Sequence, residues 1–240
     1  MDDIRRINLW SGPRNVSTAV MYAFRQRNDT SVVDEPLYAH YLCRTGVEHP
    51  AVQDVIKSQD TDGEAVVRTV LLGTAETPVR FFKHMAHHLI DLDISFLGRM
   101  DNLLLTRDPR EMLASLINQV PNPTIEGTSL PMQVRMLNHI LESGGSPIVI
   151  ESKGLLLDPE GVLRTVCERF RLEWDPGMLS WEEGPKPEDG VWAPHWYDNV
   201  HDSTGFAPYR KKDGSLPTRL EPLLAECIPL FERLRQHAIG

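Results

Sequence analysis

Hydroxyl and basic side chains gather near the start of the chain, where an apolar run gives way to a helical pattern. The run Ile7 to Trp10 ends in a Gly-Pro turn, Arg14 follows, and Ser17 and Thr18 open the next helix. The first N–H groups of a helix have no intrahelical partner and carry the positive end of its dipole. Together with a guanidinium they form a favourable site for phosphate or sulfate. The loop lacks the GxxxxGK[ST] pattern of a Walker A loop, and the simpler interpretation is a surface turn capped by Ser17.

A second anion-binding pattern lies in the middle of the chain. Arg107 follows the apolar run Asn102 to Thr106, and Ser115 lies eight residues further on, in a helix that begins at Pro109. An arginine at a strand end can make forked, charge-assisted hydrogen bonds to a phosphate. Alternatively, Arg107 pairs with a neighbouring carboxylate and Ser115 is a helix core residue. Two such elements, each at a strand-to-helix turn, are more specific than either alone.

Candidates for proton transfer follow two other apolar runs. Glu35 stands just after the run 31–33, and Lys83-His84 ends the run that begins at Val79. A carboxylate or a histidine near neutral pKa can serve as general base, and a lysine can stabilise developing negative charge. Glu35 could instead be a turn or capping carboxylate.

Histidines and aromatic residues gather in two further places. His87 and His88 follow the third apolar run, where the surface of a helix start is the favoured interpretation; no Cys or HExxH spacing accompanies them, so no metal is expected. Residues 182–215 are rich in Pro, Gly and Trp and predict a long irregular loop, of the kind that often forms a lid. Its aromatic and histidine side chains could wall an acceptor pocket or form a satellite core under the loop. These are Trp192, His195, Trp196, Tyr197 and His201.

Short apolar runs alternate with helical patterns along the chain. The expected strands are residues 7–10, 31–33, 79–83, 102–106 and 148–150, and the expected helices are residues 17–27, 63–72, 109–118, 130–143, 159–170 and 216–237. This alternation predicts an α/β fold, three αβα layers around a central, mostly parallel sheet. Residues 1–240 are expected to form one domain. In such sheets ligands bind where strands lead into helices, which is where the candidate residues stand.

The loop after the first strand resembles the 5′-phosphosulfate loop of the sulfotransferases. Pro13, Arg14, Ser17 and Thr18 match that family's loop, whereas Asn15 and Val16 replace its usual Ser-Gly. The resemblance implies a P-loop sulfotransferase-like fold. It also implies that Arg14, Asn15, Ser17 and Thr18 bind the 5′ side of 3′-phosphoadenosine 5′-phosphosulfate, the sulfuryl donor and co-substrate of the family.

Two further segments are similar to the same family. Arg107 and Ser115 have the spacing of its 3′-phosphate element, and Arg210-Lys211 resembles the Arg-Lys-Gly segment that closes over that phosphate, although Gly214 comes later than in the family. The runs DEPLY at 34–38, GPKPEDG at 184–190 and HDSTGF at 201–206 resemble a bacterial and plant branch of sulfotransferase-like proteins, some of which carry branched-chain aminotransferase-like names. Nothing in the sequence indicates the Schiff-base lysine and pyridinium partner of pyridoxal chemistry.

The resemblance implies a sulfotransferase that acts on a hydroxyl or amine of a small-molecule or carbohydrate acceptor. Glu35 matches a Glu-Pro-Leu-Tyr run of carbohydrate sulfotransferases and is the first candidate for the base. Lys83 matches the lysine of small-molecule sulfotransferases, whose base position falls on Met85 here, so His84 is an adjacent substitute. Two alternatives remain open: a P-loop nucleotide-dependent phosphotransferase or phosphatase, and a non-catalytic nucleotide-binding module.

Composition excludes several other classes of protein. The 240 residues include 25 Lys+Arg and 34 Asp+Glu, a net charge of −9, which argues against a nucleic-acid partner. No apolar run is long enough to span a membrane, and the N-terminus lacks the apolar region of a signal peptide. The three cysteines are far apart, which suggests free thiols in a reducing compartment. A cytoplasmic protein without a membrane partner is therefore expected.

Overall fold

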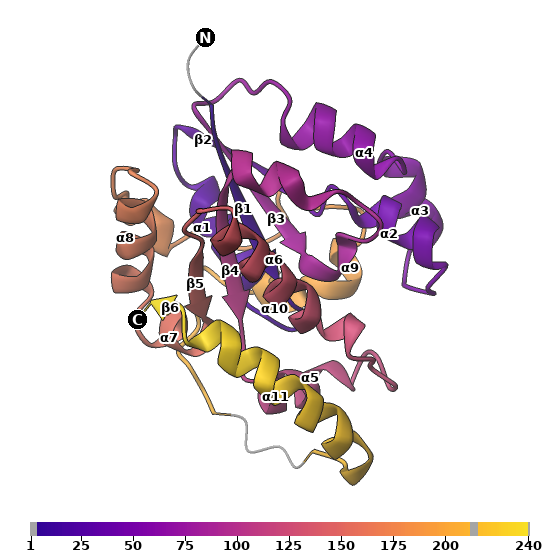
Figure 1. The fold of residues 1–240 in the computed structure, drawn as a ribbon. Coiled ribbons are helices and arrows are strands. Elements are labelled where there is room, and N and C mark those ends of the chain that lie inside the picture. The colour runs from indigo at the N-terminus through magenta and orange to yellow at the C-terminus, as the bar shows by residue number, and fades with distance from the viewer. Residues whose placement is uncertain (1–3, 212–215, 240) are drawn as a thin grey trace.

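A computed structural model describes residues 4–211 and 216–239 of the chain. Its centre is a six-stranded sheet in the order β2-β3-β1-β4-β5-β6, and every pair of neighbours is parallel. The strands are β1 (Arg5–Ser11), β2 (Thr30–Asp34), β3 (Val79–Met85), β4 (Asp101–Thr106), β5 (Ile148–Glu151) and β6 (Ala238–Ile239). Because all strands run the same way, their carboxyl ends meet at one edge, with β1 in the middle of the order (Figure 1).

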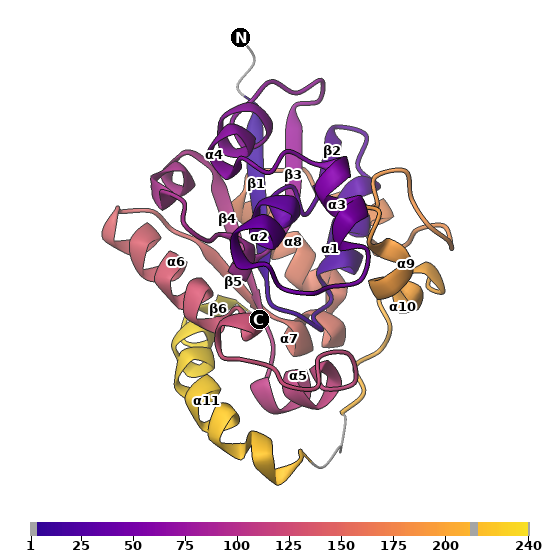
Figure 2. The ribbon, with the colours of Figure 1, turned by 90° about the vertical axis from the view of Figure 1, so that its right-hand side faces the viewer.

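Helices cover both faces of this sheet (Figures 1 and 2). Those of eight residues or more are α1 (Ser17–Arg25), α2 (Tyr38–Thr45), α5 (Pro109–Leu116), α6 (Leu130–Glu142), α8 (Pro159–Arg169) and α11 (Glu221–Arg235). The shorter ones are α3 (Val52–Ser58), α4 (Gly63–Val66), α7 (Ser152–Leu157), α9 (Ala193–Trp196) and α10 (Asp198–His201). A π-helical turn, Val67–Leu71, continues α4, and 3₁₀ turns span Ala86–His88, Ile94–Arg99, Glu126–Thr128, Pro176–Leu179 and Thr218–Leu220.

The two faces of the sheet bury two separate cores. Alternate residues of a strand point to opposite faces, so Trp10 and Phe82 pack with α5, α6 and α11, whereas Leu9 and Phe81 pack with α1 and α8. Strands buried on both faces read as continuous apolar runs, which is why they could be recognised in the sequence. The three-layer αβα architecture is thereby confirmed.

A third, smaller core lies beside the sheet and joins distant parts of the chain. Tyr38 and Leu42 of α2 and Val55 of α3 pack against Trp192 and Tyr197, which flank α9. The described part of the expected loop, residues 182–211, is thus less irregular than its composition suggests. It contains α9 and α10 (Figure 2), and Trp192 and Tyr197 pack on α2.

The strands and helices expected from the sequence are confirmed with small changes at their ends. The expected helix at 216–237 is shorter, running from Glu221 to Arg235, and the helix at 63–72 finishes as a π-helical turn. The elements not foreseen are β6 and the helices α2, α3, α7, α9 and α10. Of these, α2, α7, α9 and α10 border the site described next.

Candidate active site

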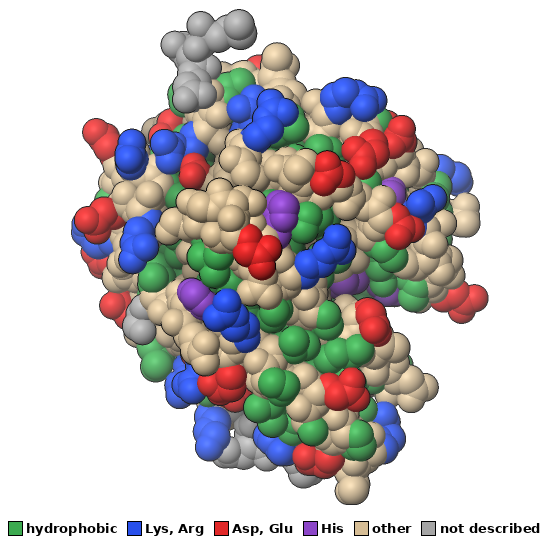
Figure 3. All heavy atoms as spheres, in the orientation of Figure 1, with side chains coloured by type: hydrophobic (Ala, Val, Ile, Leu, Met, Phe, Trp, Pro, Cys, Tyr) green, Lys and Arg blue, Asp and Glu red, His purple; other side chains and the backbone are tan. Residues whose placement is uncertain are grey.

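A cavity of about 1440 Å³ opens at the carboxyl edge of the sheet. The loop after β1, the ends of β3 and β5, the start of α5 and parts of the segment 192–211 form its wall. In the space-filling view a notch is cut into the right-hand side of the molecule, with histidine side chains along its upper edge (Figure 3). All but one of the residues singled out from the sequence as catalytic or donor-binding line this cavity. They are Arg14, Asn15, Ser17, Thr18, Glu35, Lys83, Arg107, Ser115, Arg210 and Lys211.

The loop after β1 is held close to neighbouring backbone. A Cβ on Gly12 would lie 2.8 Å from the carbonyl oxygen of Thr128, so only glycine fits there without a shift. Behind the loop, the Gln133 amide donates 2.9 Å hydrogen bonds to the carbonyl oxygens of Trp10 and Leu105. These contacts fix the end of β1 against β4.

Helix α1 presents its N-terminus to the cavity. Its N-cap residue is Val16, and within residues 4–211 and 216–239 no side chain caps this end. Ser17 and Thr18, at the first two helical positions, line the cavity. Uncapped N–H groups together with two hydroxyls are suited to an anion.

Asn15 ties the loop to two strand ends. Its side-chain amide donates to the carbonyl oxygen of Leu105 at 3.1 Å, and the hydroxyl of Ser152, which also reaches the carbonyl of Thr106, donates to its Oδ1. Asn15 thus anchors a loop that lacks the family's usual Ser-Gly. Its amide group is already engaged with protein atoms, although the residue still borders the cavity.

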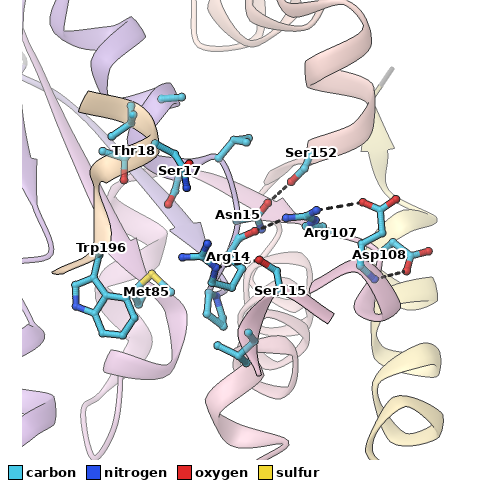
Figure 4. A pocket seen from close by; sticks show the side chains of 18 of the residues that line it. Arg14, Asn15, Ser17, Thr18, Met85, Arg107, Asp108, Ser115, Ser152 and Trp196 are labelled. Carbon is cyan, nitrogen blue, oxygen red and sulfur yellow. Dashed lines mark hydrogen bonds and ion pairs between the residues drawn. The ribbon is translucent and has the colours of Figure 1, made fainter. Parts of the chain in front are cut away.

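Two arginines, Arg14 and Arg107, lie next to each other in the cavity wall (Figure 4). Arg14 has a left-handed backbone (φ 57°), and its Nε donates to Ser115 Oγ at 3.1 Å. Arg107 donates to the carbonyl oxygen of Arg14 at 2.6 Å and pairs with Glu111 at 3.2 Å. Burial, and then the charge of Arg107, lower the pKa of Arg14. The two expected anion elements are thereby in direct contact, and bound negative charge would relieve the repulsion between their cations.

The segment near the C-terminus closes the same end of the cavity. Arg210 and Lys211 line it, and the neighbouring Tyr209 hydroxyl donates to Glu111 at 2.5 Å. The hydrogen bond to Glu111 raises the pKa of Tyr209 to about 12. The rest of the expected basic segment, Lys212 to Gly214, lies outside the described residues.

A buried triad of charges stands at the other end of the cavity. The Lys83 ammonium contacts Glu35 Oε1 and lies 3.1 Å from Asp34 Oδ1. Asp34 is the register partner of Lys83 in the pairing of β2 with β3. The side chains of Lys83, Asp34 and Glu35 are only 2%, 1% and 7% exposed. Glu35 has a left-handed backbone (φ 39°), a strained conformation of the kind that clusters at active sites and ligand-binding segments.

In this triad the pKa of Lys83 shifts against the direction that burial alone would give, whereas the pKa of Glu35 shifts with it. Burial alone would lower the pKa of Lys83, but the charges of Asp34 and Glu35 raise it. Burial raises the pKa of Glu35, and the attraction of Lys83 only partly offsets it. One ammonium facing two carboxylates leaves an excess negative charge. Glu35 is therefore the member that is ready to take up a proton.

Tyr197 braces the triad from the segment that carries α9. Its hydroxyl lies 2.5 Å from Lys83 Nζ and 2.7 Å from Asp34 Oδ2, and it accepts a 3.1 Å hydrogen bond from the Trp192 indole. Trp192 and Tyr197 thus line the cavity as expected for a pocket wall, and they also position the charged group.

His84 lies apart from the cavity. It follows Lys83 in β3, so its side chain points to the opposite face of the sheet, where it stacks on Trp10 with ring centroids 4.0 Å apart. Its Nε2 lies 3.0 Å from Asn8 Oδ1. Burial, and then the charge of Lys83, lower the pKa of His84 to about 3. The structure brings Glu35 and Lys83 together but excludes His84, which cannot reach an acceptor bound in the cavity.

His88 is buried and His87 is half-buried in the cavity wall, which corrects the expectation that both lie on the surface of a helix start. His88 stacks between Tyr38 and Tyr41, with ring centroids at 4.7 and 4.6 Å. His87 Nδ1 lies 2.7 Å from Ser129 Oγ, and burial, then the charge of His49, lower the pKa of His87 to about 3. An aromatic and imidazole chamber therefore adjoins Glu35.

The remaining aromatic candidates divide between the cavity and its surroundings. Trp196 lines the cavity (Figure 4). His195 instead borders a smaller cavity of about 340 Å³ beside it, and His201 pairs with Asp189 at 2.9 Å.

Comparison with known proteins identifies the family. Residues 5–238 match the family model described as a sulfotransferase domain. The chain belongs to the sulfotransferase family. The resemblance to sulfotransferases expected from the sequence is thereby confirmed. The resemblance to the branch with aminotransferase-like names is confirmed by two relatives. The chain is 37% and 38% identical over 232 residues to branched-chain-amino-acid aminotransferase-like proteins 2 and 1 of Arabidopsis thaliana. Those matches cover 96% of this sulfotransferase-family chain but only 41% and 42% of the relatives' length.

Solved sulfotransferase structures share the fold. The sulfotransferase domain of the Synechococcus PCC 7002 olefin synthase superposes with a TM-score of 0.59 at 14% identity, covering 100% of this chain and 98% of that domain. A sulfotransferase from Alicyclobacillus acidocaldarius gives 0.54 at 13% identity, with 99% and 98% covered. Mouse sulfotransferase SULT7A1, complexed with PAP, gives 0.59 at 10% identity, with 98% and 89% covered.

Several residues that shape the site of this sulfotransferase-family chain carry no motif. In the sequence, Asp34 stands out only as the first residue of the run DEPLY, although its place beside Lys83 follows once the strand register is known. Tyr41 and His49 come from α2 and the loop after it, which the sequence pattern did not predict. In the part of the chain that the structure describes, no group of three or more His, Cys, Asp or Glu could hold a metal ion, and no helix is long and apolar enough to cross a membrane.

Proposed function

We propose that the chain transfers a sulfuryl group from 3′-phosphoadenosine 5′-phosphosulfate to a hydroxyl or amine of a small-molecule or carbohydrate acceptor. One observation carries the proposal: a single cavity is lined at one end by Arg14 and Arg107, and at the other by Glu35 and Lys83. A donor bound at the cationic end would direct its reactive group toward the buried base. The mouse sulfotransferase of the same fold, which was crystallised with PAP, supports the choice of donor.

The donor would be held by the two anion elements. Arg14, with the hydroxyls and free N–H groups at the start of α1, would bind the 5′ phosphosulfate. Arg107 and Ser115 would bind the 3′-phosphate, with Arg210 and Lys211 closing over it. In this complex Arg14 exchanges its present contact with Ser115 for the ligand, which leaves that hydroxyl available to the 3′-phosphate.

The chemistry would occur at the Glu35–Lys83 end. The acceptor oxygen forms a bond to sulfur, the bond from sulfur to the 5′-phosphate oxygen breaks, and the acceptor proton passes to Glu35. Lys83 stabilises the negative charge that develops around the transferred group. Once Glu35 is protonated, Asp34 still pairs with Lys83, so the ammonium keeps a buried counter-ion throughout.

Calorimetric titration with adenosine 3′,5′-bisphosphate tests the donor assignment. Arg107→Ala is expected to weaken binding by about 1.5–3 kcal/mol, roughly 10- to 150-fold, because a charge-assisted hydrogen bond is lost. Arg110→Ala is the matched control, since Arg110 lies nearby, in the first turn of α5, but pairs with Glu221 in an exposed salt bridge. It should leave the affinity unchanged.

Other outcomes of this titration would favour other functions. No binding of the bisphosphate, together with magnesium-dependent turnover of ATP, would favour a phosphotransferase or phosphatase. Binding of the bisphosphate without any cleavage of the phosphosulfate donor would favour a non-catalytic nucleotide-binding module.

A further inference from the structure

His88 is a buried imidazole that no sequence motif places in the site. Its side chain is 3% exposed, and its Nδ1 is fully buried without a hydrogen-bond partner in the described part of the chain. A buried polar atom without a partner costs free energy and calls for an explanation. The nearest carboxylate atom is Glu35 Oε2, 3.7 Å from Nδ1.

The surroundings of His88 fix the plane of its ring. Tyr38 and Tyr41 stack on it at interplanar angles of 9° and 25°. The ring lines the cavity. Because Nδ1 is turned to Glu35, Nε2 is the nitrogen left to meet a molecule bound in the chamber. The imidazole therefore borders both the cavity and the Glu35 carboxylate.

The charges around His88 favour its neutral form. Burial, and then the charges of His87, His49, Lys83 and His84, lower the pKa of His88 well below its usual range. A bare Nδ1 lone pair facing a carboxylate would be repulsive, so the proton of the neutral ring belongs on Nδ1. Closing the gap to an ordinary N–H···O distance requires a movement of only about 0.5–1 Å, within reach of a carboxylate rotation.

Resting on the function proposed above, we propose that His88 relays the acceptor's proton to Glu35. In this step Nε2 takes the proton from the acceptor hydroxyl while Nδ1 gives its own proton to Glu35 Oε2. The acceptor oxygen bonds to sulfur, and the electron pair of the broken sulfur–oxygen bond leaves with the 5′-phosphate. His88 remains neutral with its proton moved to Nε2, and Glu35 becomes neutral beside the Lys83–Asp34 pair.

Nitrogen NMR of ¹⁵N-histidine-labelled protein with bound adenosine 3′,5′-bisphosphate tests the relay without an acceptor. We expect neutral His88 protonated at Nδ1 at neutral pH, and a change in its Nδ1 resonance in Glu35→Gln. Protonation of His88 at Nε2, or an Nδ1 resonance that is unchanged in Glu35→Gln, would overturn the relay. This measurement needs no variant at position 88, so it stands even if such a variant folds poorly.

The kinetic test follows release of the bisphosphate from 3′-phosphoadenosine 5′-phosphosulfate, with water as the acceptor. General base catalysis contributes about 10²–10⁴-fold, so His88→Gln should lose at least about 100-fold in rate and retain its affinity for the bisphosphate. Added imidazole should restore part of the rate in His88→Gly. His139→Gln, a change in α6 outside the cavity, is the matched control.

The two proposals fail in different ways. A wild-type rate in His88→Gln would overturn the relay and leave the donor and Glu35 assignments standing. Wild-type protein that neither binds the bisphosphate nor cleaves the donor would overturn the proposed function. The same NMR measurement on the free protein would then still decide whether His88 and Glu35 form a hydrogen-bonded pair.

Discussion

At the scale of single residues, the Lys83 ammonium is the shared counter-ion of two carboxylates. Asp34 and Glu35 both contact its ammonium, but only Glu35 lines the cavity. A buried cation facing one carboxylate would hold it ionised and make it a poor base. A second carboxylate takes over part of that role, so Glu35 can accept a proton without leaving Lys83 unpaired.

Replacing Lys83 by methionine should expose this balance. Lys83→Met leaves Asp34 and Glu35 buried without a cation, so the free energy of unfolding at neutral pH should fall by about 3–5 kcal/mol. The loss should shrink as the pH falls, because protonation of the buried carboxylates removes the charge that the missing ammonium leaves uncompensated. Urea unfolding of both proteins at neutral and mildly acidic pH measures this difference.

The sign of this pH dependence distinguishes a charge effect from a packing effect. In the wild type, the raised pKa of Lys83 contributes stability that is present below its unfolded value of 10.5 and lost only as the pH rises through its folded value. A loss in Lys83→Met that stays constant or grows toward acid pH would show that the ammonium contributes by packing alone. Arg44→Met, which breaks an exposed pair with Asp91, should cost about 1 kcal/mol or less.

The chemistry of Lys83 was visible in the sequence, but that of its neighbours was not. Two adjacent residues of a strand face opposite sides of a sheet, so one of Lys83 and His84 had to lie outside the cavity. Which one depends on the helices that cover each face. The sequence predicts a surface position for His88, because its local pattern does not indicate α2, whose tyrosines bury this side chain.

At the scale of elements, the predictable parts are those with a strong local pattern. Buried parallel strands and the long amphipathic helices follow from apolar periodicity, and with them the placement of Arg14 and Arg107 at one sheet edge. The segment 182–205 has no such pattern, because its order depends on contacts with distant parts of the chain. Asp189 makes one such contact, accepting hydrogen bonds from the Tyr22 hydroxyl of α1, and within the segment it accepts one from the backbone N–H of Lys186.

Loosening that segment should impair catalysis more than donor binding. Asp189→Ala removes the hydrogen-bond partner of Tyr22 and His201. The segment that contains Tyr197, and that holds its hydroxyl against Lys83, then becomes more mobile. A displacement of about 1 Å at a reacting group costs up to about 100-fold in rate. We therefore expect donor cleavage to slow by about 10- to 100-fold, whereas calorimetry should find the affinity for adenosine 3′,5′-bisphosphate unchanged.

A neighbouring residue provides the control for this prediction. Glu188 also ties the segment to α1, but through a partly exposed pair with Arg25. Glu188→Ala should therefore have little effect, since such pairs contribute about 1 kcal/mol or less. Equal losses of rate in both variants would mean that Asp189 has no special part in placing Tyr197.

At the scale of the whole molecule, an acidic chain surrounds a cationic cavity end. The net charge is −9, yet Arg14, Arg107, Arg210 and Lys211 border the same space. On the face in Figure 3, basic and acidic side chains are interspersed, with no extended region of one sign. Field lines focused by a cleft attract an anion locally even when the protein as a whole is negative. The acidic composition is therefore unfavourable for binding nucleic acid over the protein surface, but it is compatible with binding one nucleotide in the cavity.

This arrangement predicts that salt weakens nucleotide binding in proportion to the ligand's charge. Between about 0.1 and 1 M salt the Debye length falls from about 10 to 3 Å, so attraction beyond direct contact is lost. The dissociation constant of adenosine 3′,5′-bisphosphate should rise several-fold over this range, that of adenosine 5′-monophosphate less, and that of adenosine hardly at all. Arg107→Ala should flatten the response to the bisphosphate, because it removes one of the cations that attract it. An affinity that strengthened with salt would mean that the acidic surface, and not the cationic end of the cavity, governs the approach of the ligand.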